Sequence, residues 1–188
     1  MAPKPLKRSI ILQQIVVLTS CAVIDLFAGS ILEGMKRSIE TLPGLIVMIP
    51  PLIDLRGNIG CALGSRLGSA LHLGTIKPRF AMSAELRANV ISAIIVSVLG
   101  SLAIGLMSLV TSLIVGVAAI GFPKLLLIAL LSGVLSGLII VPVTVLLAFV
   151  SFRRGWDPDN VTGPVMSTLG DVVTMSCIVL SVFLSGWL

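Results

Sequence analysis

Five long apolar stretches, separated by short polar segments, set the strongest limit on how this chain can fold. Each stretch exceeds the roughly 20 residues that a helix needs to cross a bilayer. Only 11% of the residues are charged, against about 25% in a soluble domain, and the mean hydropathy is +1.15. Lipid offers no partners to backbone N–H and C=O groups, so these stretches should be helical. The sequence therefore predicts an all-α, multi-pass protein of the cell membrane with five transmembrane helices.

The expected helices fill the chain as a single transmembrane domain, residues 1–188, and we expect no soluble regulatory domain. Their approximate ranges are 9–34, 42–73, 86–119, 123–152 and 161–188.

The second predicted helix is unlike the others. Pro50 and Pro51 remove two backbone donors, and two charges, two glycines and an amide follow them. Irregular backbone at membrane depth is tolerated only where it is buried in protein or lines water. We therefore expect this helix to be broken near 50–58. Further along, glycines recur every four residues at Gly60, Gly64 and Gly68, which predicts close packing against another helix.

The basic residues predict the orientation. With five spans and the N-terminus inside, eight of them fall on the inner side and three on the outer side, as the positive-inside rule requires. The inner residues are Lys4, Lys7, Arg8, Lys77, Arg79, Arg87, Arg153 and Arg154, and the outer residues are Lys36, Arg37 and Lys124. The C-terminus is then expected outside.

The sequence argues against nucleic-acid binding and against catalysis. The net charge of +5 comes from residues that flank apolar segments, and they form no patch with aromatic residues. No Ser/His pairing, HExxH motif or second carboxylate at catalytic spacing is present. Cys21, Cys61 and Cys177 have neither disulfide nor metal spacing and are interpreted as small buried hydrophobic residues. We expect neither an enzyme nor a nucleic-acid partner.

Acidic residues within apolar sequence mark the candidate site. Asp171 lies inside the last helix, and intramembrane carboxylates usually line an ion path. Mg²⁺ keeps several waters and takes only one or two protein carboxylates, which suits one such Asp in each of two chains meeting at a pore. Asp157 precedes Pro158 and is expected to cap the same helix. Nearly four turns separate it from Asp171, so both should project from a similar face.

Two further acidic residues have open roles. Asp25 could line the pathway, although pairing with Arg56 or Arg66 is slightly favoured. For Asp54, an ion pair with Arg56 or with another helix is about as favoured as a place on the pathway, because buried charges are usually paired.

Two blocks of sequence resemble the MgtE family of divalent-cation transporters and its eukaryotic magnesium solute-carrier relatives. The run DPDNVTGP from Asp157, followed by STLGDVVT from Ser167, resembles the signature of the family's last helix. The run PPLIDLRGN from Pro50, followed by SRL from Ser65, resembles the motif of the second helix with its Gly-Asn pair. The two blocks are specific when they occur together.

The resemblance implies a five-helix protomer that works as a homodimer, or as one half of a fused two-repeat transporter, with an ion pore near the dimer axis. Asp171 matches the family's pore carboxylate, which holds hydrated Mg²⁺ with help from backbone carbonyls about one turn earlier. Asn58 and Gly57 match the pore-side break. No prosthetic group is expected, and Mg²⁺ is the bound or transported ion. The residues expected to contact the metal are Asp171, Asn58, Asp54, Asp157 and Ser167.

The main hypothesis is therefore a divalent-cation channel or transporter that prefers Mg²⁺. One alternative is an exchanger driven by Na⁺ or H⁺ on the same scaffold, with Asp25 or Asp54 as its coupling site. Another is a non-transporting membrane scaffold whose acidic residues only pair with arginines.

Overall fold

The computed structural model describes residues 6–79, 82–116 and 121–185, and within these ranges the regular structure is entirely helical. The helices are α1 (Leu6–Gly34), α2 (Lys36–Thr41), α3 (Leu45–Leu73), α4 (Ala84–Val115), α5 (Phe122–Arg153) and α6 (Pro158–Leu184).

All of the helices except the short α2 are long and apolar enough to cross a membrane, which confirms the predicted five spans. The described helix ends lie within four residues of the predicted ones. The predicted ends at 119 and 188 lie outside the described residues. The sequence did not predict α2, which occupies the polar connection after α1.

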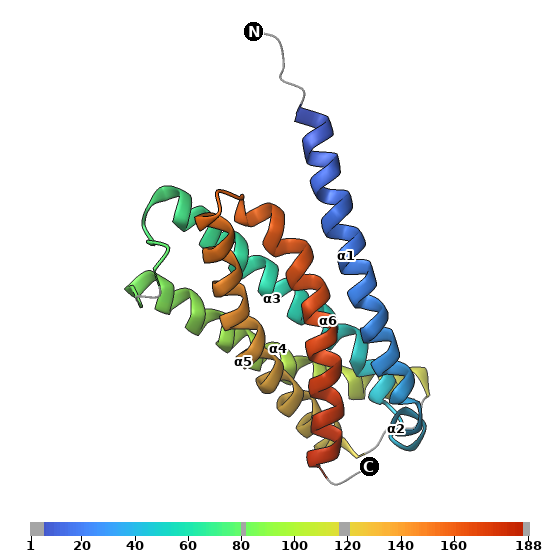
Figure 1. Cartoon of the computed structure of the whole chain (residues 1–188). Helices are drawn as coiled ribbons and strands as arrows, with labels where there is room; N and C mark the ends of the chain where they lie inside the picture. The colour runs from blue at the N-terminus through green and yellow to red at the C-terminus, as the bar shows by residue number, and fades with distance from the viewer. Residues whose placement is uncertain (1–5, 80–81, 117–120, 186–188) are drawn as a thin grey trace.

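The five spans run alternately in opposite directions (Figure 1). As a result, Lys77, which follows α3, and Arg153, at the end of α5, lie at one end of the bundle, whereas Lys36, at the start of α2, and Lys124, in the first turn of α5, lie at the other. Lys4, which was counted with the first group, lies outside the described residues. This arrangement keeps the two predicted groups of basic residues apart.

Helices α3 and α6 form the most extensive helix pair and occupy the middle of the bundle (Figure 1). Helix α1 packs against α6 on one side, and α4 and α5 pack against each other and against α3 on the other side. Helix α1 is the most peripheral span, with 11% of its apolar window buried, against 44% for α3, α5 and α6. The central pair therefore has protein on several sides.

The predicted break near 50–58 is wrong, because α3 runs as one helix from Leu45 to Leu73 through Pro50 and Pro51. The two prolines remove backbone hydrogen bonds, but packing holds the chain helical on both sides of them. Met48 and Leu52 are fully buried there, against partners from other helices. Gly57 does not open the backbone of α3. It lies where α6 comes close, because a Cβ there would be 3.5 Å from the Ser167 Cα.

The glycine stripe of α3 packs closely against another helix, as the sequence predicted, and the structure shows that this helix is α6. A Cβ at Gly64 would lie 2.6 Å from the Thr162 Oγ1, and one at Gly60 would lie 2.9 Å from the Met166 Cβ. Real Cβ atoms do not approach so closely, so larger residues at these positions would push the helices apart. The stripe thus fixes how near the two central helices lie, and with that the geometry of the residues they present.

Candidate functional site

Asp54 and Arg56 of α3 lie in different surroundings, although only one residue separates them in the chain. Arg56 is completely buried, whereas Asp54 is exposed. Successive helical residues are about 100° apart, so residues two apart point to nearly opposite faces. An Asp54–Arg56 ion pair, one of the alternatives for Asp54, is therefore not found, and within the described residues the close contact between a basic and an acidic side chain is His72–Asp157.

The Arg56 guanidinium is held by α4. One of its terminal nitrogens donates to the Ser97 hydroxyl, and the other donates to the Ser97 carbonyl at 3.2 Å and to the Ser101 hydroxyl at 2.5 Å. The pairing of Asp25 with Arg56 or Arg66 is also not found. Serine oxygens of α4 thus accept hydrogen bonds from both terminal nitrogens of the buried cation, and no acidic side chain is paired with it in the described structure.

Asp54 and Asn58 form a polar pair on the exposed face of α3. The Asn58 Nδ2 donates to the Asp54 Oδ2 at 2.9 Å, across one helical turn. This bond orients the carboxylate and leaves its other oxygen without a recorded protein donor in the described structure. Both side chains are accessible from outside the single protomer.

On α6, Ser167 and Asp171 are likewise one turn apart, and they lie where α6 crosses α3. A Cβ at Gly170 would lie 3.1 Å from the Gly57 backbone nitrogen, so the two backbones nearly touch there. Ser167 is exposed and Asp171 is partly buried. Because the helices meet at Gly57, they bring the pair on α3 and the pair on α6 into one region.

A third helix contributes a carboxylate to this region. Asp25 of α1 and Asp54 of α3 both lie close enough to Asp171 for their charges to interact with it. No group of three His, Cys, Asp or Glu side chains in the described ranges is arranged to ligate a metal directly. The arrangement gathers negative charge around an open region rather than forming a closed cage.

Asp157 lies away from this region, at the start of α6. Its carboxylate accepts a hydrogen bond from the Asp159 backbone N–H at 3.1 Å, and Pro158 takes the first helical position, which confirms the predicted cap. The same carboxylate lies 3.7 Å from the His72 Nε2 at the end of α3. The 14 residues between Asp157 and Asp171 correspond to roughly 21 Å along the helix, so the two cannot hold one ion together.

The sequence interpretation missed the buried polar network around Arg56. Its signal was present in the four-residue spacing of Ser97 and Ser101, which places both hydroxyls on one face of α4. Two polar atoms within the described residues remain buried without a hydrogen-bond partner, the Arg56 Nε and the Thr174 Oγ1.

Comparison with known proteins agrees with the resemblance of the two sequence blocks. A sequence model of MgtE, described as a divalent cation transporter, matches residues 49–181, which is well over half of the chain. The chain belongs to the MgtE family. It is therefore a multi-pass membrane protein of a transporter family, as the sequence predicted.

The relatives of this MgtE-family chain include eukaryotic solute carriers. It is 27% identical to solute carrier family 41 member 3 of Rattus norvegicus over 143 residues, which cover 72% of the chain and 30% of the relative. It is 25% identical to solute carrier family 41 member 2 of Gallus gallus over 165 residues, which cover 79% of the chain and 27% of the relative. The chain thus spans less than a third of these proteins. No solved structure matches it.

Proposed function

We propose that this chain moves divalent cations across a membrane, with Mg²⁺ preferred, and that a hydrated cation is held at Asp171. The observation that supports this most is the gathering of Asp25, Asp54 and Asp171 from three helices, without an ion pair to an arginine in the described structure. Uncompensated carboxylates within membrane spans are costly and mark ion pathways. The family description as a divalent cation transporter agrees with this chemistry.

Hydrated Mg²⁺ suits the arrangement of these side chains. Mg²⁺ gives up its waters reluctantly and is bound by one or two carboxylates, with the remaining contacts made through water. Asp171 is the primary ligand in this proposal, and Asp54, Asn58 and Ser167 bind the ion's waters. In this proposal Asp157, at the start of α6, lies at the entrance of the cation pathway and attracts cations to the pathway.

The site is proposed to be completed by a second copy of the chain. Asp54, Asn58 and Ser167 are all exposed in the single protomer, so one side of the site is open. A two-fold axis beside these residues would bring two Asp171 carboxylates to one pore and would cover the exposed polar surface. The end with the larger group of basic residues faces the inside of the cell, as the positive-inside rule directs, and the C-terminus lies outside.

A coupled exchanger is the second candidate, and the additional carboxylates favour it. Neither Asp25 nor Asp54 is needed as a direct ligand when Mg²⁺ keeps its waters, so either can bind Na⁺ or H⁺. Mg²⁺ flux in sealed vesicles that follows an imposed Na⁺ or pH gradient would support the exchanger. Flux that follows only the Mg²⁺ gradient and the membrane potential would support a channel.

Cation binding can be tested by the thermal stability of the purified protein in detergent. An ion that binds only the folded state raises the unfolding midpoint with its concentration. At a hundredfold excess over Kd, we expect Mg²⁺ to raise the midpoint by about 5 °C or more, and Asp171→Asn to remove the rise.

Asp159→Asn is the matched control, since it removes one acidic charge from the first turn of the same helix, outside the proposed site. It should keep the rise. If Asp171→Asn keeps the rise as well, Asp171 is not the binding residue. If both variants lose it, the effect of Mg²⁺ is a general response to charge.

A further inference from the structure

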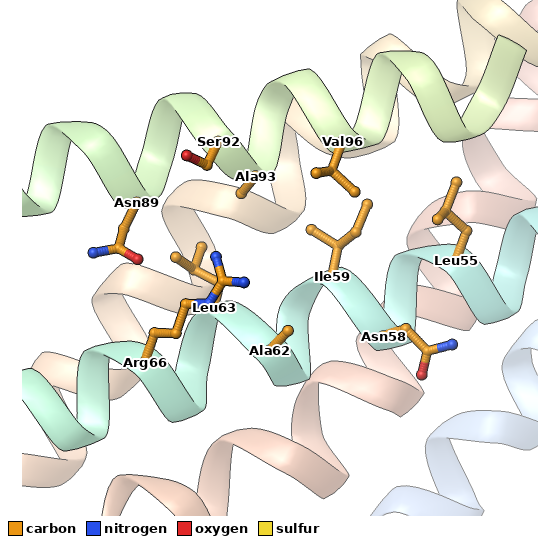
Figure 2. A pocket seen from close by; sticks show the side chains of 10 residues that line it. All are labelled: Leu55, Asn58, Ile59, Ala62, Leu63, Arg66, Asn89, Ser92, Ala93 and Val96. Carbon is orange, nitrogen blue, oxygen red and sulfur yellow. The ribbon is translucent and has the colours of Figure 1, made fainter.

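A groove between α3 and α4 opens to the outside of the protomer and encloses about 190 Å³ (Figure 2). Its walls are mainly apolar, and Leu55 and Ile59 of α3 lie there opposite Val96 of α4. Because both helices are membrane spans, the outside of this groove meets lipid or another membrane-embedded surface. Arg56, whose side chain is fully buried, is not among the residues that line the groove.

One end of the groove is polar and cationic. The Arg66 side chain reaches from α3 into the space between the two helices, with Asn89 of α4 nearby (Figure 2). Arg66 forms no ion pair within the described structure. The Asn89 Nδ2 donates one hydrogen bond to the Glu85 carbonyl at 3.0 Å, so its second N–H is available. This end of the groove can therefore bind an anionic oxygen.

The polar end lies toward the end of α3, where the long Arg66 side chain can extend to the headgroup layer. With 29 residues, α3 is roughly 44 Å long, which exceeds the hydrocarbon thickness of about 30 Å, so its ends extend into the headgroup layers. Arg66 is seven residues before the end of α3, and Lys77, Arg79 and Arg87 follow at the same end of the bundle. Basic residues between membrane helices attract anionic headgroups.

We propose that an anionic phospholipid binds in this groove, with its phosphate on Arg66 and Asn89 and one acyl chain along Leu55, Ile59 and Val96. Charge favours a lipid over a second copy of the chain as the occupant. A two-fold axis along the membrane normal beside this groove would bring two Arg66 side chains together at the same depth. Repulsion between their like charges disfavours that arrangement.

The test is the thermal midpoint of the purified full chain with added phosphatidylglycerol or with phosphatidylcholine of the same acyl chains. We expect phosphatidylglycerol to raise the midpoint by about 3 °C more than phosphatidylcholine does. Arg66→Gln should remove this difference. Arg87→Gln, which removes a charge at the same end of the bundle but outside the groove, should keep it. Inorganic phosphate should give no rise, because it lacks the acyl chain.

A second variant tests the apolar part of the groove. Val96 is 51% exposed, so Val96→Trp can fill the groove without disturbing buried packing, and it should also remove the phosphatidylglycerol effect. Equal shifts with the two lipids, or equal losses in Arg66→Gln and Arg87→Gln, would overturn the proposal. It would also be overturned if Val96→Trp bound lipid like the wild type, or if this variant changed the oligomeric state in size-exclusion chromatography with light scattering, which would make the groove an interface between copies.

Discussion

The two faces of α3 differ in the charge that they carry and in its exposure. On one face, Arg56 is completely buried and is bonded to the hydroxyls of Ser97 and Ser101. On the other face, two residues earlier in the chain, Asp54 is exposed and accepts from Asn58. The cation is thus part of the packed interior, and the carboxylate is part of the surface where α6 and α1 contribute further acidic residues.

This difference separates stability from cation binding within a single helix. A buried guanidinium whose two terminal nitrogens donate to α4 contributes to the folded state. An exposed carboxylate that lacks a cationic partner contributes little to folding and remains available to a bound ion. Substitutions on the buried face should therefore lower the unfolding midpoint, and those on the open face should lower the affinity for Mg²⁺.

The largest expected effect on stability comes from Arg56→Ala. It removes a large buried side chain and three hydrogen bonds to α4, at a cost of about 3 kcal/mol. The midpoint should fall by about 8 °C in detergent. Arg56→Lys should give an intermediate loss, because an ammonium group does not reproduce the planar fork of donors. A midpoint for Arg56→Ala equal to that of the wild type would show that the buried face does not stabilise the fold.

The contact between α3 and α6 should be nearly as sensitive. In Gly64→Val, the new Cβ would lie 2.8 Å from the Thr162 Cβ and would force the helices apart, at a cost of about 2 kcal/mol. The matched control is Gly29→Ala in α1, where nothing lies within 4 Å of the added Cβ. We expect the midpoint to fall only in the α3 variant. Equal midpoints in the two variants would mean that α6 does not depend on the glycine stripe for its position.

Asp54→Asn tests the open face. The change keeps the size of the side chain and removes a charge near Asp171, so we expect a stability change within about 0.5 kcal/mol and a loss of Mg²⁺ affinity of about tenfold. Mg²⁺ titrations followed by the thermal midpoint measure both quantities. A large fall in stability without added Mg²⁺ would place Asp54 among the residues that hold the fold together.

The smallest effect is expected for Asn58→Ala. This variant removes the single N–H that orients the Asp54 carboxylate, which is worth about 1 kcal/mol, or about a fivefold loss of Mg²⁺ affinity. In the Asp54→Asn background the same change should add little, since the charged partner is already absent. Full additivity of the two changes would contradict the proposed role of the pair.

Features that depend on nearby residues could be predicted from the sequence, and features that depend on distant contacts could not. The five spans follow from the length of each apolar stretch, and the Asp157 cap follows from the proline after it. The break at Pro50 was wrong, because packing against other helices decides whether a helix survives the loss of two donors. The partners of Arg56 are more than forty residues away along the chain; the spacing of Ser97 and Ser101 places both hydroxyls on one face of α4 but does not assign them to Arg56.

The candidate site could be predicted from the sequence only in part. Asp171 was singled out by its place within apolar sequence, and Gly57 and Asn58 by their resemblance to a family motif. Spacing alone does not bring α3 and α6 together. The close approach at Gly57 and Gly170 supplies that link. The proximity of Asp25 to Asp171 depends on how α1 packs against α6, which the sequence does not specify.

The most direct test of Asp171 as the cation-binding residue is Mg²⁺ uptake into proteoliposomes, followed with an entrapped Mg²⁺ indicator. Wild type, Asp171→Asn and Asp159→Asn should be reconstituted at equal density, with the midpoint of each variant measured first to establish folding. We expect uptake by the wild type and by Asp159→Asn, and loss of at least about 90% of it in Asp171→Asn, because the ion loses its charged ligand. Uptake by a folded Asp171→Asn at the wild-type rate would contradict the assignment of Asp171 to the cation pathway.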